Sequence, residues 1–204
     1  QCLVGSEMCI RDRLCMAQYF YEEKNEIWVT TWNKLYNLSF LREFHIHFLE
    51  HVYHEDIVMH AMLALNTRSF TLTSQTTYLY NCKREDSITN MEQGYTLKHL
   101  NDLTIVFSEI RRLIQADNNL SKHLQKEINL YYLFEIYHRY LPAMYSNIKR
   151  VDLIKGLARL SQNCLPPILE TRLTFKSIKR FLFLKLPFNI QYLIKSHKYK
   201  KSRV

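Results

Sequence analysis

Two adjacent acids, Glu55 and Asp56, stand at the start of an apolar run over residues 55–65. The run carries apolar side chains on nearly every side, which predicts a helix that is buried all round. Backbone amides at a helix N-terminus are unpaired and the dipole is positive there, so a carboxylate in that place is expected to stay ionised. Such a carboxylate suits a general base that takes a proton from a hydroxyl group. The plain alternative is that the two acids only cap the helix.

An aromatic and basic segment, WNKLY, precedes the acids at residues 32–36. The face of Trp32 could stack on a sugar ring, and Lys34 could reach a diphosphate or a sugar hydroxyl. Trp32, Lys34 and Tyr36 are therefore candidates for binding a sugar acceptor. The alternative is that the two aromatic residues belong to the core and that Lys34 extends to solvent.

A loop rich in charges and hydroxyl groups follows at residues 78–89, with the sequence YLYNCKREDSIT. Lys83 or Arg84 could neutralise the charge of a departing phosphate, as cationic groups do in many transferases. The adjacent Glu85 and Asp86 weaken the positive field, so which cation faces phosphate stays open. The alternative is an ordinary charged surface loop.

In this order, the three motifs resemble the second half of a family 2 glycosyltransferase catalytic domain, the inverting kind with a GT-A fold. The resemblance covers about residues 15–92. It implies that Asp56 is the general base and that Glu55 is its supporting carboxylate. The residues that it assigns to acceptor binding are Trp32, Lys34, Tyr36 and His54. Those that it assigns to the donor diphosphate are Lys83, Arg84 and Ser87.

The resemblance also implies a fold and a division of the chain. The expected fold class is α/β, with residues 14–93 as the carboxy-terminal half of a GT-A domain that lacks its amino-terminal donor-binding half. A mostly α-helical extension, residues 94–204, follows it, and residues 1–13 look like a non-native leader. A β-branched and aromatic composition predicts a strand over residues 27–32. Further extended runs are expected at residues 46–49, 69–72 and 76–80, and helices at residues 14–24, 38–44, 55–65, 97–116, 120–139, 142–160, 167–184 and 188–197.

The motifs for donor and metal binding are missing from the sequence. It contains no Asp-x-Asp and no Gly-rich phosphate loop. The resemblance implies that the full-length enzyme uses a nucleotide-sugar with Mg²⁺ or Mn²⁺, and that this fragment alone binds no metal ion and transfers no sugar. The implied acceptor is a polysaccharide or a lipid-linked glycan, as in the synthesis of lipopolysaccharide.

Histidines cluster around the acidic pair, at positions 45, 47, 51, 54 and 60. A zinc site is disfavoured because no Cys or second acidic ligand recurs at metal-binding spacing. His54 could instead hydrogen-bond the acceptor or tune Asp56. The other four are expected to be partly buried surface residues.

Positive charge is concentrated at the end of the chain. The formal net charge is +9, and residues 171–204 hold ten Lys or Arg and no acid. Cations interleaved with apolar and aromatic side chains suit an anionic membrane surface. Residues 172–203 are therefore expected to bind the inner face of the cell membrane. The alternatives are an apolar stripe that packs on the helical body and binding to nucleic acid, which is not the expected partner.

Two classes of function remain open. The first is an inverting glycosyltransferase, cytoplasmic and peripheral to the membrane; scattered cysteines and the lack of a long apolar run agree with that location. The second is a non-catalytic helical adaptor that binds an anionic membrane or nucleic acid. An Asp56 that is open to a groove favours the first class, and one that is buried and ion-paired favours the second.

Overall fold

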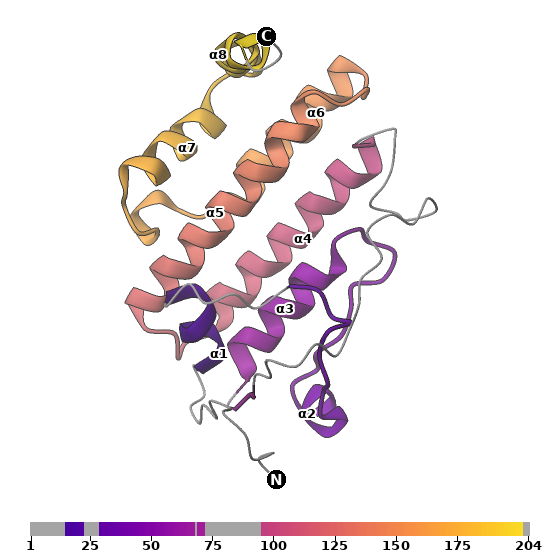
Figure 1. The fold of residues 1–204 in the computed structure, drawn as a ribbon, viewed down its shortest axis with the longest axis vertical. Helices are drawn as coiled ribbons and strands as arrows, with labels where there is room; N and C mark the ends of the chain where they lie inside the picture. The colour runs from indigo at the N-terminus through magenta and orange to yellow at the C-terminus, as the bar shows by residue number, and fades with distance from the viewer. Residues whose placement is uncertain (1–14, 23–28, 68, 72–94, 202–204) are drawn as a thin grey trace.

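The computed structural model describes residues 15–22, 29–67, 69–71 and 95–201, and Figure 1 shows its ribbon. Within these ranges the backbone forms eight α-helices, together with one π-helical and one 3₁₀ turn. In chain order the elements are α1 (Cys15–Ala17), η1 (Gln18–Glu22), α2 (Leu38–Glu43), α3 (Glu55–Asn66), α4 (Leu97–Ala116), α5 (Lys122–Met144), α6 (Arg150–Asn163), η3 (Ile168–Glu170), α7 (Phe175–Lys185) and α8 (Phe188–Lys201).

The expected α/β fold class is wrong. The described residues contain no strand, so this part of the chain is a helical assembly and not half of a GT-A domain. Residues 29–32 of the expected first strand form a bend and a turn, and residues 46–49 have no regular structure. Phe70 makes only an isolated bridge, and residues 76–80 lie outside the described residues.

Local hydrogen bonds explain why the first expected strand does not form. An extended segment is stable only when partner strands pair with its backbone. Here the Lys34 ammonium donates to the carbonyl of Thr30, and the Tyr36 hydroxyl donates to the carbonyl of Thr31. The segment therefore satisfies these carbonyls by folding back on itself.

The expected helices agree better with the structure. α4 has the bounds that the sequence predicts, and Thr96 begins it with a capping box that it forms with His99. The expected start at Pro142 is wrong, because Pro142 lies in the last turn of α5 and α6 begins at Arg150. The expected helix over residues 167–184 is divided into η3 and α7.

One hydrophobic core joins helices from both sides of residue 93. Figure 1 shows α3, α4 and α5 running side by side, and α4 also packs against α6. At that contact a Cβ added to Gly156 would lie 2.4 Å from Cδ2 of Leu100, so any larger residue would require the Leu100 side chain to move. The expected domain boundary falls outside the described residues and stays a prediction.

Candidate functional site at the start of helix α3

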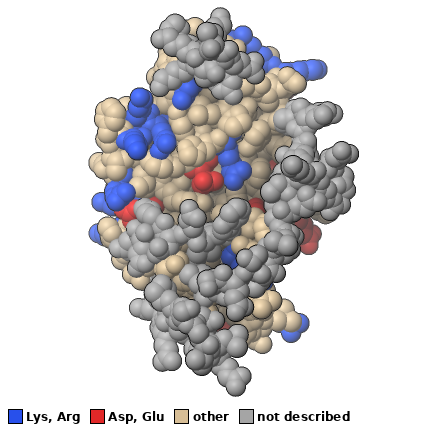
Figure 2. All heavy atoms as spheres, viewed as in Figure 1, with Lys and Arg blue, Asp and Glu red and all other residues tan. Residues whose placement is uncertain are grey.

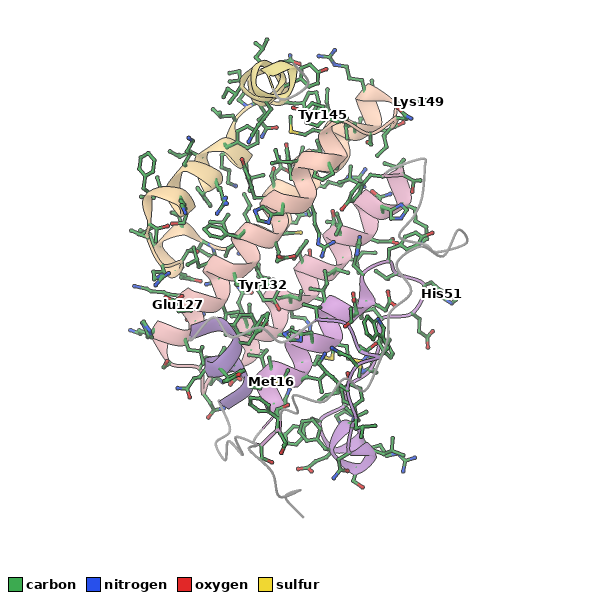
Figure 3. All side chains as sticks on the ribbon, viewed as in Figure 1. Met16, His51, Glu127, Tyr132, Tyr145 and Lys149 are labelled. Atoms are coloured by element: carbon green, nitrogen blue, oxygen red, sulfur yellow. The ribbon has the colours of Figure 1, made fainter. Side chains whose placement is uncertain are left out.

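The turn that leads into α3 holds its backbone in a left-handed conformation. His54, the residue before α3, has φ 66° and ψ 29°, and His51 has φ 60°. Histidine adopts this conformation more readily than most residues, yet each instance costs on the order of 1–3 kcal/mol. Figure 3 shows His51 at the outer edge of the molecule. Strain of this kind persists only where surrounding contacts fix the backbone.

Asp102 of α4 provides those contacts. Its buried carboxylate accepts a hydrogen bond of 3.0 Å from the backbone amide of Tyr53. Lys98 bridges the same carboxylate, at 2.5 Å, and the carbonyl of His51, at 2.8 Å. The ring of Tyr53 stacks on that of His99, with centroids 4.0 Å apart. Helix α4 therefore fixes the turn that presents the acidic pair.

Asp56 is the candidate base, and it lies half-buried in the first turn of α3. Burial raises the pKa of its carboxyl group and the neighbouring Glu55 raises it further, whereas Arg139 and the backbone amide of Ile57 lower it. Burial therefore outweighs the helix terminus that the sequence emphasises. No described side chain forms an ion pair with Asp56. A raised pKa makes the carboxylate a stronger proton acceptor.

Lys34 connects the aromatic segment to Asp56. Its Nζ donates to the carbonyl of Thr30 at 2.5 Å and to Oδ1 of Asn33 at 2.7 Å. Burial lowers the pKa of Lys34 to about 8, and the negative charge of Asp56 opposes that change. The two charged groups are therefore electrostatic neighbours, although a turn, helix α2 and a loop separate them along the chain.

The two aromatic residues of this segment differ in exposure. Trp32 is 40% exposed. Tyr36 is half-buried, and its hydroxyl donates to the carbonyl of Thr31 at 3.1 Å. Part of Trp32 therefore reaches solvent, whereas the hydroxyl of Tyr36 is engaged with the backbone.

His54 is neutral and keeps one ring nitrogen available. Burial is the main cause that lowers its pKa to about 4, followed by the charge of Arg139. Its Nδ1 lies 3.5 Å from a guanidinium nitrogen of Arg139, so we assign the ring proton to Nε2. That Nε2 is buried and has no hydrogen-bond partner among the described residues. A ligand that reaches it could accept its hydrogen bond.

His60 extends the cluster one turn further along α3. It stands four residues after Asp56, which places both on one face of the helix. The side chain is 1% exposed, and within the part of the chain that the structure describes neither ring nitrogen has a hydrogen-bond partner. Burial lowers its pKa to about 3, and the charge of Lys34 contributes. The sequence-based expectation of a partly buried surface residue is therefore wrong for His60.

The structure thus brings Lys34, His54 and Asp56 together, with Trp32 on the same segment as Lys34. Sequence reasoning missed Arg139 and His60. The four-residue spacing from Asp56 could have indicated His60, but no local signal connects the acidic pair to Arg139, which lies 85 residues from His54. The remaining candidates, Lys83, Arg84 and Ser87, lie outside the described residues.

One hollow in the described part of the chain is lined by residues other than Asp56. It has a volume of about 450 Å³ and is open to solvent. Its lining comes from α2 and the loop after it, and consists of Leu38, Leu41, Arg42, His45, Ile46 and His47. Neither Lys34 nor His54 lines this hollow either.

Comparison with known proteins gives no family. No protein-family model, no curated protein and no solved structure matches this chain. The structure adds one finding about membranes: none of the helices in the described ranges is both long enough and apolar enough to cross one. The resemblance to glycosyltransferases stays a prediction from the motifs.

Proposed function

We propose that Asp56 is the general base of an inverting glycosyl transfer onto a hydroxyl group of a glycan. The Asp56 carboxylate accepts the proton of the acceptor hydroxyl. The acceptor oxygen then forms a bond to the anomeric carbon of the donor sugar, and the nucleoside diphosphate leaves with the electron pair of the broken bond. The observation that carries the proposal is a half-buried carboxyl whose pKa is raised and which no described side chain pairs with.

The neighbours of Asp56 support this role. Lys34 supplies a positive charge near the carboxylate, which favours its ionised form. His54 has a buried and unpartnered Nε2 that can hydrogen-bond the acceptor. The exposed ring of Trp32 can stack against a sugar, and Glu55 is the supporting acid in the first turn.

The donor side of the proposal rests on the motifs alone. It assigns the diphosphate of a nucleotide-sugar to Lys83, Arg84 and Ser87. The part of the chain that the structure describes has no group of three or more His, Cys, Asp or Glu side chains that could hold a metal ion. The proposed mechanism includes no metal-dependent step.

A non-catalytic adaptor is the competing function. It gains weight if Asp56 is buried and ion-paired and not open to a groove. The half-buried position of Asp56, without an ion pair to any described side chain, favours the catalytic role. Arg139 acts on Asp56 electrostatically, yet its ion pair is with Glu135, at 3.4 Å.

Replacement of Asp56 by Asn tests the proposal in the gene product that carries this sequence. We expect the consumption of a nucleotide-sugar in the presence of a glycan acceptor to slow by roughly 10²–10⁴, the usual contribution of a general base. Asp152→Asn is the matched control because Asp152 also lies in the first turn of a helix, α6. The control should keep full turnover, and equal turnover in both variants would contradict the proposal.

A further inference from the structure

Helix α7 carries apolar side chains on two opposite faces. Phe183 and Leu184 are buried against the body of the protein. Phe175, Ile178 and Leu182 follow each other at spacings of three and four residues, so they share the opposite face. They are 81%, 41% and 58% exposed. A surface helix normally presents polar residues on its outward face, so this stripe requires an explanation.

The inner face of α7 is already held by the rest of the molecule. Arg172, just before the helix, forms an ion pair of 2.9 Å with the buried Glu127 of α5. The guanidinium carbon of Arg180 lies 3.8 Å from the centroid of the Phe134 ring, also on α5. Arg172 and Arg180 are therefore engaged with side chains of α5. The expectation that the apolar stripe packs on the body describes only this inner side.

The outer face combines the apolar stripe with free-standing cations. Lys179 lies between Phe175 and Leu182 along the stripe, Lys176 lies at its edge, and both are exposed. No acid follows Glu170 in the sequence. In Figure 2 the Lys and Arg atoms gather over α7, and no Asp or Glu lies among them. The outer face is therefore both apolar and positively charged.

Helix α8 repeats this division. Gln191 is buried, whereas Ile190 and Ile194, one turn apart on another side, are 44% and 47% exposed. The backbone helix continues to Lys201, through a stretch whose sequence adds Lys198 and Lys200. Each of these two consecutive helices therefore has one face that packs on the protein and one apolar face that is exposed.

We propose that the outward faces of α7 and α8 lie on an anionic lipid bilayer. Aliphatic side chains would enter the boundary between head groups and acyl chains, while Lys176 and Lys179 would meet the lipid phosphates. Single-stranded nucleic acid fits less well, because it binds by stacking on aromatic rings and the outward stripe of α7 has only Phe175. This inference does not depend on the proposed role of Asp56.

Vesicle flotation of the purified chain tests the inference. We expect binding to vesicles of mixed phosphatidylcholine and phosphatidylglycerol, and little binding to phosphatidylcholine alone. Lys176→Gln combined with Lys179→Gln should weaken binding by about 25-fold, since each cation near the surface contributes about fivefold. Serine at positions 175, 178 and 182 should weaken it on the order of tenfold or more, because the apolar anchor is lost.

A matched pair of cations on α6 serves as the control. Lys155 and Arg159 are exposed and four residues apart, so replacing both by Gln removes the same charge from another helix face. This variant should bind the mixed vesicles as well as the unmodified chain. Circular dichroism of all variants checks that they keep their helices, which we expect because the substituted side chains are exposed.

Three results would overturn the inference. The first is equal loss of binding in the α6 control, which would mean that only net charge matters. The second is no binding to the mixed vesicles while single-stranded RNA is bound through the same lysines. The third is no vesicle binding together with a dimer, seen by size-exclusion chromatography, that serines on the α7 stripe dissociate.

Discussion

Two buried polar side chains, His60 and Gln191, show how the start of α3 differs from the packing of α8 on α5. Each is 1% exposed. Oε1 of Gln191 accepts a hydrogen bond of 2.5 Å from the Tyr140 hydroxyl, and its Nε2 donates one of 2.8 Å to the carbonyl of Phe183. Neither ring nitrogen of His60 has a hydrogen-bond partner in the described ranges. Paired buried groups hold structure together, whereas unpaired ones cost stability and point to a site.

The largest expected effect concerns the paired side of this comparison. Gln191→Leu leaves the buried Tyr140 hydroxyl without its partner, whereas the Phe183 carbonyl keeps its hydrogen bond from the Leu186 amide. We expect the free energy of unfolding to fall by about 1–3 kcal/mol, the cost of one orphaned buried group. Urea denaturation measures this change, with the exposed Gln162→Leu of α6 as control. A loss no larger than that of the control would mean that the hydrogen bonds of Gln191 contribute little.

The pH dependence of stability tests the unpaired side. The pKa of His60 is about 3 in the folded protein and about 6.5 in the unfolded chain. The unfolded state therefore binds more protons below pH 6.5, and stability falls as the pH is lowered. Between pH 7 and pH 5 this costs about 2 kcal/mol, and His54, with a pKa lowered to about 4, acts in the same direction.

His60→Leu should remove about half of this pH dependence, since His54 remains, and should also stabilise the protein at neutral pH because the unpaired buried imidazole is gone. The control is His138→Leu, at an exposed position of α5. Urea denaturation at pH 5 and at pH 7 measures the free energy of unfolding of both variants and of the unmodified chain. The same pH dependence in His60→Leu and in the unmodified chain would show that another group is responsible.

A smaller effect is expected at Asp102, which holds the turn before α3. Asp102→Asn weakens the bonds to Tyr53 and Lys98 while keeping the size of the side chain. We expect a loss of about 1–2 kcal/mol and faster hydrogen exchange at the Tyr53 amide. Unchanged exchange at that amide would mean that the turn is held by the stacking on His99 instead.

The smallest effect concerns the strained backbone of the same turn. His51→Gly should raise stability by up to about 1 kcal/mol, because glycine adopts a positive φ without a steric cost but loses more entropy on folding. His51→Ala keeps the strain and should bring no gain. Equal stability of the two variants would contradict the strain at His51.

The sequence reveals the local parts of this structure and misses those that depend on distant contacts. The signals that define α4, a capping residue at Thr96 and a periodic apolar pattern, are local in the sequence, so the bounds of the helix are predictable. Composition alone suggests a strand over residues 27–32, but a strand needs a partner strand. The side chains of Lys34 and Tyr36 instead hydrogen-bond two backbone carbonyls of this segment. The contribution of Arg139 depends on how α5 packs, which no short pattern encodes.

For helix α7, too, the sequence leaves two alternatives open that only the packing of the helix decides. If α7 had a single apolar face, that face could pack on the body or bind a membrane, but not both. Exposure divides its apolar residues between two faces, with Leu184 inward and Leu182 outward. The sequence shows that the helix is rich in apolar residues and cations, but only the position of α5 determines which face stays free.

The most direct test of the account combines stability and turnover in one variant, Asp56→Asn. We expect this variant to lose its turnover while its free energy of unfolding stays the same or rises. Both burial and Glu55 disfavour the ionised carboxyl group of Asp56. If the charge of Asp56 only stabilises the first turn of α3, the variant should instead lose about 0.3–1 kcal/mol of stability and keep its turnover. That result would contradict the central claim.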